Sequence, residues 1–180
     1  MVTEMECRRL PKIELHAHLN GRCSRVFKIF PLIQSLTTSK EAVKTATIDV
    51  IREFAEDGVV YLELRSTPKT TSEMSKKDYV DAIIEGIKEG SQGVEMVTKL
   101  ILSIDRRQSA EEAEQTVEVA AADETGLIVG IELSGNPAID GRKFLPVLER
   151  ARSSGLKVSI HLAEVFFSKL HISYFLIMIK

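Results

Sequence analysis

Two histidines separated by one residue, His16 and His18, are the first side chains of this sequence whose type and spacing could bind a metal. They end an apolar run that begins at Pro11 and is followed by the turn residues Asn20 and Gly21. In an extended strand, residues i and i+2 project from the same side, so the two imidazoles would lie close enough to hold one cation. Neutral imidazole is a ligand of zinc and related transition metals. A His-x-His pair also arises by chance, so the pair alone does not decide the matter.

A third histidine, His161, strengthens the metal interpretation through its position. It follows residues 156–160, an apolar run typical of a buried strand. If the two strands are parallel, their carboxyl ends lie at the same edge of the sheet, and His161 comes near the first pair. The fourth histidine, His171, lies in an apolar C-terminal segment without such a signal, and we interpret it as a bystander.

Alternating helices and strands must position these histidines. Hydrophobic periodicity predicts strands that begin near residues 12, 59, 96, 127 and 157, with a helix between each pair. Ser39, Ser75 and Ser109 are the predicted helix caps, and Pro146 predicts that the last helix begins near residue 145. Residues 26–33, which contain a proline, are interpreted as a further short helix.

This strict alternation predicts an α/β fold with a parallel sheet, either doubly wound or a (β/α) barrel. No G-x-G-x-x-G motif follows the first strand, which argues against a dinucleotide-binding sheet. Polar residues cluster at the carboxyl ends of the predicted strands, where both architectures place their active sites. These residues are His18, Arg65, Ser66, Asp105, Ser134 and His161.

Composition narrows the class of ligand and the cellular compartment. The 180 residues suit one domain. With 24 basic and 26 acidic side chains, the net charge is −2 and there is no basic run, so the sequence gives no sign of the positively charged surface that binds a nucleic acid polymer. A small-molecule ligand is therefore predicted. Cys7 and Cys23 are too few for a disulfide framework, and the acidic N-terminus is not a signal peptide, so we expect a cytoplasmic protein. The apolar part of residues 165–180 is shorter than the roughly 18 residues of a membrane span.

Five motifs at the ends of successive predicted strands together resemble the adenosine deaminase family. They are His-Ala-His-Leu-Asn-Gly at 16–21, Leu-Arg-Ser-Thr-Pro-Lys at 64–69, Asp105, Leu-Ser-Gly at 133–135 and His-Leu-Ala-Glu at 161–164. The resemblance runs from about Leu10 to Glu164 and implies a TIM-type barrel with one zinc ion at its C-terminal mouth. It also implies hydrolytic deamination of a purine nucleoside monophosphate, N6-methyl-AMP or an AMP-like nucleotide, or of adenosine, with release of an amine and formation of the inosine form.

The resemblance assigns roles to individual residues. His16, His18 and His161 are the implied zinc ligands, and Glu164 resembles the family's proton donor to purine N1. Implied substrate contacts are His18, Asn20, Ser66, Thr67, Pro68, Lys69, Asp105 and Gly135. The hydroxyls of Ser66 and Thr67 with the ammonium of Lys69 could hold a monophosphate.

The sequence departs from the family pattern in three ways: a short connection, a different C-terminal segment, and the absence of the histidine that positions the attacking water and of the paired aspartates that complete the zinc site and hold the purine. The connection from Gly21 to Thr37 is short, and residues 165–180 are an apolar tail in place of strands six to eight, so we expect a partial barrel domain at 1–164 with about five of eight units. We expect such a chain to be a poor catalyst and poorly stable, and a complete chain to be monomeric. Two alternatives stay open: an inactive variant that binds metal or nucleotide without turnover, and another metal hydrolase of the amidohydrolase type.

Overall fold

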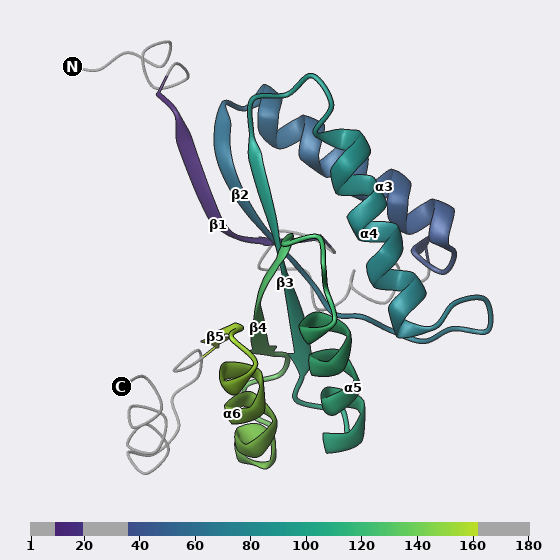
Figure 1. The fold of residues 1–180 in the computed structure, drawn as a ribbon, viewed down its shortest axis with the longest axis vertical. Helices are drawn as coiled ribbons and strands as arrows, with labels where there is room; N and C mark the ends of the chain where they lie inside the picture. Colours follow the sequence, from purple (N-terminus) through teal and green to yellow (C-terminus); the bar gives the residue numbers. More distant parts are fainter. Residues whose placement is uncertain (1–9, 20–35, 162–180) are drawn as a thin grey trace.

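The computed structural model describes residues 10–19 and 36–161, which form one curled sheet with helices packed on one face (Figure 1). All five strands are parallel and pair in chain order, β1-β2-β3-β4-β5. The strands are β1 (Lys12–His18), β2 (Val59–Ser66), β3 (Val97–Asp105), β4 (Ile128–Ser134) and β5 (Lys157–Ile160). The helices are α3 (Lys40–Glu56), α4 (Lys76–Gly90), α5 (Ala110–Ala121) and α6 (Leu145–Ser153), the last preceded by the 3-10 turn η2 (Arg142–Phe144).

The predicted helix caps are confirmed. The Ser39 hydroxyl accepts a hydrogen bond from the backbone of α3, and Ser75 and Ser109 each form a capping box. These caps satisfy backbone N–H groups that the first turn of a helix otherwise leaves without partners. Pro146 lies in the first turn of α6, where its missing N–H costs nothing. The predicted helix at 26–33 lies outside the described residues.

The two faces of the sheet differ in chemistry. Leucine and isoleucine side chains on one face are fully buried against the helices, among them Leu62, Leu64, Leu100, Leu102 and Ile131. Alternate residues point to the other face, and three neighbouring strands carry polar residues there in one row, because Ser103 pairs with Glu132 and Glu132 pairs with Ser159. The inner face of the curled sheet is therefore polar near the carboxyl ends of its strands. Within the described ranges, no helix combines the length and apolar character that a membrane crossing needs.

Candidate metal centre

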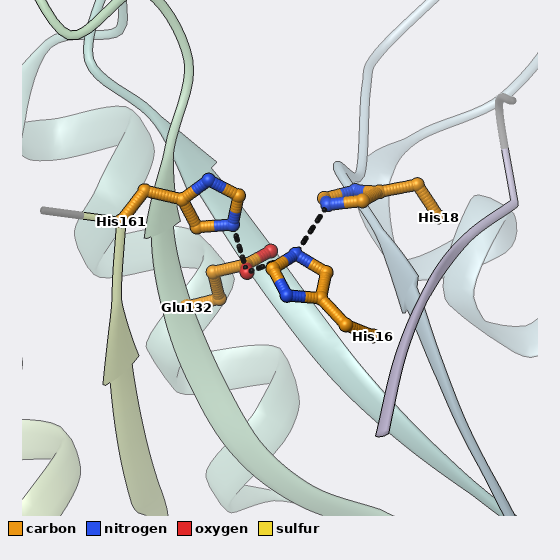
Figure 2. A group of neighbouring side chains, drawn as sticks. All are labelled: His16, His18, Glu132 and His161. Carbon is orange, nitrogen blue, oxygen red and sulfur yellow. Dashed lines mark hydrogen bonds and ion pairs between the residues drawn. The ribbon is translucent and has the colours of Figure 1, made fainter. Parts of the chain in front are cut away.

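The three histidines predicted to bind a metal lie together at one end of the sheet. His16 and His18 come from β1, and His161 immediately follows β5. Nε2 of His16 lies 3.0 Å from Nε2 of His18, and the ring centre of His161 lies 4.7 Å from that of His16 (Figure 2). The parallel sheet thus brings together side chains from its first and last strands.

Glu132 of β4 joins this cluster, although the sequence analysis did not select it as a site residue. Its side chain is fully buried, and its Oε1 lies 2.6 Å from Nε2 of His161 and 3.6 Å from Nε2 of His16 (Figure 2). One ligand atom from each of the four residues lies within 4.8 Å of the others. A signal was available, because Glu132 is the charged residue of the apolar run 127–133, and a buried carboxylate needs a charged, hydrogen-bonding or metal partner.

The surroundings of Glu132 keep it ionised. Burial alone would raise its pKa, but hydrogen bonds from His161 and Ser103 and the charge of Arg65 outweigh burial and lower the pKa to about 2. The Ser103 hydroxyl donates to Oε2 over 2.7 Å, and Nη1 of Arg65 donates to Oε1. The Glu132 carboxylate is therefore negatively charged at neutral pH and is paired with the positive charge of Arg65.

The surroundings of the first two histidines favour the neutral form of the imidazole. Burial lowers the pKa of His16 below that of a free imidazole, and the charge of Arg65 lowers it further. Burial is also the main cause of the lowered pKa of His18. Neutral imidazole is the form that binds a metal, so this environment favours metal binding.

Two distances in this cluster are close to those of a tetrahedral zinc site, while Nε2 of His161 lies in direct hydrogen-bond contact with Oε1 of Glu132, over 2.6 Å. With Zn–N bonds of about 2.0–2.1 Å, neighbouring ligand atoms of a tetrahedral site lie about 3.3 Å apart. The distances of 3.0 Å from Nε2 of His16 to Nε2 of His18 and 3.6 Å from Nε2 of His16 to Oε1 of Glu132 are close to that value. Imidazole nitrogens with a carboxylate are also the donor types that zinc binds.

The predicted phosphate-binding segment 66–69 begins at the last residue of β2. Ser66 is buried, and its hydroxyl lies 2.9 Å from the hydroxyl of Tyr79 on α4, so it serves the contact between strand and helix. Lys69 donates from Nζ to the Thr37 hydroxyl over 3.2 Å, and burial lowers its pKa. Thr67 is half-buried and Pro68 is buried between them. The substrate contacts proposed for these residues stay predictions.

Asp105 and Gly135 lie against each other at the ends of β3 and β4. The Asp105 carboxylate accepts hydrogen bonds from Nε and Nη2 of Arg107 over 2.9 and 2.7 Å. Burial alone would raise its pKa, but the hydrogen bonds and charge of Arg107 outweigh burial and lower it. Gly135 has a φ of 93°, and a Cβ there would lie 2.7 Å from Oδ1 of Asp105. This position requires glycine, both for its backbone angle and for the space beside Asp105.

Replacing Gly135 with alanine is expected to lower the free energy of unfolding. The left-handed backbone costs an L-residue about 1–2 kcal/mol, and the forced contact with Asp105 adds about 1–3 kcal/mol. Gly126→Ala is the matched control, because Gly126 also has a positive φ, 67°, but an added Cβ would meet nothing within 4 Å. Urea unfolding of both variants measures the difference. An equal loss of stability in the two would show that the loop at Asp105 simply moves aside.

Two predicted site residues, Asn20 and Glu164, lie outside the described residues, as does the apolar tail 165–180. The roles assigned to them remain predictions.

Comparison with known proteins identifies the family of this chain. A sequence profile described as adenosine deaminase matches residues 24–171. The chain belongs to the adenosine deaminase family. A curated relative within this family, N6-methyl-AMP deaminase-L of Xenopus laevis, is 38% identical over 196 residues, covering 88% of this chain and 56% of its own length.

Solved structures of adenosine deaminase relatives share the fold. The apo structure of N6-methyl-AMP deaminase from Arabidopsis thaliana matches with a TM-score of 0.83 and 37% identity, over 89% of this chain and 60% of that one. The structure of the ADAL-IMP complex matches with a TM-score of 0.86 and 36% identity, over 94% of this chain and 62% of that one. The predicted TIM-type barrel of about five units is confirmed, as five parallel strands curled into a half-barrel. The chain spans little more than half the length of the relatives it matches.

Proposed function

We propose that this chain is built for zinc-dependent hydrolytic deamination of a purine nucleoside monophosphate. The observation that carries the proposal is the convergence of His16, His18, His161 and Glu132 within 4.8 Å at the carboxyl ends of the strands. In barrels of this type, that face holds the active site. Relatives named N6-methyl-AMP deaminase and a neighbour solved with IMP, a purine nucleoside monophosphate, support the choice of substrate class.

Three histidines and one glutamate of this chain would have separate roles in the reaction. His16, His18 and His161 would hold the zinc ion through neutral imidazoles. Bound zinc supplies Lewis-acid chemistry and lowers the pKa of a coordinated water to about 7, which makes a nucleophile at neutral pH. Glu164 would give a proton to purine N1 as the oxygen of water adds to C6, and the amine at C6 would leave afterwards.

Charged groups at neighbouring strand ends would orient the nucleotide. Lys69, which also donates to the Thr37 hydroxyl, would offer its ammonium to the 5′-phosphate. Asp105, held ionised by Arg107, can accept a hydrogen bond from the purine or ribose, and Gly135 leaves room beside it. A monophosphate therefore suits the site better than a free nucleoside, which has no group for Lys69 to bind. These assignments, with those for Asn20, Ser66, Thr67 and Pro68, are part of the proposal.

A second function is favoured by one feature of the cluster. Three imidazoles and the Glu132 carboxylate can supply four protein ligands, and a zinc site closed in this way is structural rather than catalytic. The chain would then bind metal or nucleotide without turnover.

Deamination by the zinc-loaded chain separates these two functions. The ultraviolet spectrum is expected to shift on incubation with N6-methyl-AMP as the 6-amino substituent is lost. Glu164→Gln is expected to reduce the rate by about 10²–10⁴-fold, the usual cost of removing a general acid or base, while zinc stays bound. Glu118→Gln, an exposed carboxylate on α5, is the control and should not change the rate. Bound zinc without a spectral shift on N6-methyl-AMP or AMP would favour the closed, non-catalytic site.

A further inference from the structure

A single buried side chain, Arg65 of β2, contacts the strands that carry all four residues of the metal cluster. Its Nη1 donates to Glu132 on β4 and, over 3.2 Å, to the Ser159 hydroxyl on β5. Its Nε and Nη2 donate to the Leu15 carbonyl on β1 over 3.3 and 2.8 Å. The Ser103 hydroxyl on β3 donates a hydrogen bond to Glu132 and so connects β3 to the same pair. The Arg65–Glu132 pair therefore links all five strands of the sheet.

The contact with Leu15 falls where β1 is irregular. Glu14 pairs with Leu62 and Ala17 pairs with Leu64, so two residues of β1, Leu15 and His16, stand opposite one residue of β2. An extra residue of this kind bends the strand and re-aims side chains, and it leaves backbone groups outside the ladder. The guanidinium of Arg65 donates to the carbonyl of Leu15, the residue directly before His16, the first predicted metal ligand.

The contact with β5 is also close to a histidine. Ser159 precedes His161 by two residues. Glu132, which also binds Arg65, is ionised and therefore accepts a hydrogen bond from Nε2 of His161. The planar guanidinium offers its donors in a fixed fork, so these contacts constrain β1 relative to β5 more than a flexible ammonium would.

We propose that Arg65 is a positioning residue of the metal centre, which holds the strand of His16 and His18 and the strand of His161 at the spacing that one metal ion needs. This role rests on the metal site of the proposed function but requires no turnover. It also explains why a positive charge lies so near a cation site. The Glu132 carboxylate compensates the charge, and the N–H groups of the guanidinium bind the Leu15 carbonyl on β1 and the Ser159 hydroxyl on β5.

Metal affinity tests the proposal in the full 180-residue chain. Co²⁺ is the probe, because its visible absorption reports the number and geometry of its ligands. Arg65→Met is expected to weaken Co²⁺ binding by about 10–100-fold, the usual cost of removing a side chain that orients metal ligands, and to change the absorption bands. Arg65→Lys should lose part of this affinity, and Ser159→Ala, which removes only the contact with β5, should lose less.

The matched control is Lys76→Met. Lys76 is also a buried cation, but it ties α4 to α5 by donating to the Glu112 carbonyl and the Thr116 hydroxyl, away from the histidines. Its loss should lower the free energy of unfolding and leave Co²⁺ affinity unchanged. Unchanged Co²⁺ affinity and spectrum in a folded Arg65→Met variant would overturn the proposal. If Arg65→Met does not fold, unchanged affinity in both Arg65→Lys and Ser159→Ala would overturn it instead.

A metal-free measurement separates this proposal from the proposed function. Side-chain ¹⁵N resonances of His16, His18 and His161 in the apo chain should move in Arg65→Lys and Ser159→Ala and stay in place in Lys76→Met. Failure of the unsubstituted chain to bind Co²⁺ would contradict the proposed metal chemistry. The histidine resonances would still decide the positioning role, which falls if they do not respond to substitution at Arg65.

Discussion

Replacing Glu132 with glutamine is expected to lower the free energy of unfolding of the metal-free chain by about 3–5 kcal/mol, the usual cost of removing one partner of a buried ion pair. Both side chains of the Arg65–Glu132 pair are buried, at 7% and 0% exposed. Glutamine keeps the shape of the side chain but not its charge, so Arg65 would remain as a buried cation without a compensating anion. A loss of this size is a large part of the stability of a typical domain.

The same carboxylate predicts how stability depends on pH. The pKa of Glu132 in the folded chain is about 2, below the ordinary value of a glutamate. Its ionised form is therefore favoured by folding, and the stability that it contributes is present above the unfolded pKa and is lost as the pH falls through the folded pKa. Acidification of the apo chain from about pH 5 to pH 2 should lower its free energy of unfolding, and Glu132→Gln should remove much of this dependence.

Urea unfolding over this pH range measures both effects. Glu118→Gln is the control, because Glu118 belongs to an exposed ion pair with Arg150, and such pairs contribute about 0–1 kcal/mol. If Glu132→Gln were no less stable than Glu118→Gln, the buried pair would not stabilise the sheet as the structure indicates.

The elements of this fold could be predicted because their signals are local. Each predicted cap, at Ser39, Ser75 and Ser109, begins a helix in the structure, since capping depends on a hydroxyl and the backbone three residues away. Apolar strands between these helices imply a parallel sheet. The parallel sheet in turn predicts that His18 and His161, at the ends of different strands, come close together, and they do.

The hydrogen bonds that surround the metal cluster, those of Glu132 and Arg65, could not be predicted because they depend on the register between strands. Nothing in the run that contains Glu132 indicates that it pairs with Ser103 on one side and Ser159 on the other. The irregular pairing of β1 with β2, which brings the Leu15 carbonyl to Arg65, has no sequence signal either, since no glycine or proline marks it. The contact of the Ser66 hydroxyl with Tyr79 is another example, because it depends on how α4 packs against β2.

Zinc is expected to raise the thermal midpoint of unfolding, because a ligand that binds only the folded chain stabilises it by mass action. At a free zinc concentration 100 times the dissociation constant the gain is about 2.7 kcal/mol, or about 5–11 °C for a chain of this size. His161→Asn should abolish the increase, because it removes the ligand from β5. His171→Asn is the matched control: it also removes one of the four histidines, but one without a predicted role, and should keep the full increase.

The pH dependence of this increase tests whether the imidazoles are the ligands. Zinc needs them neutral, and burial lowers the pKa of both His16 and His18, so the increase should persist at pH values where a free imidazole is already half protonated and fade only on further acidification. Mg²⁺ should give no increase, because it prefers oxygen ligands in octahedral geometry. Differential scanning calorimetry with each metal measures these midpoints. An equal zinc effect in His161→Asn and His171→Asn would mean that zinc binds elsewhere on the chain, and the convergence of β1, β4 and β5 would then need another explanation.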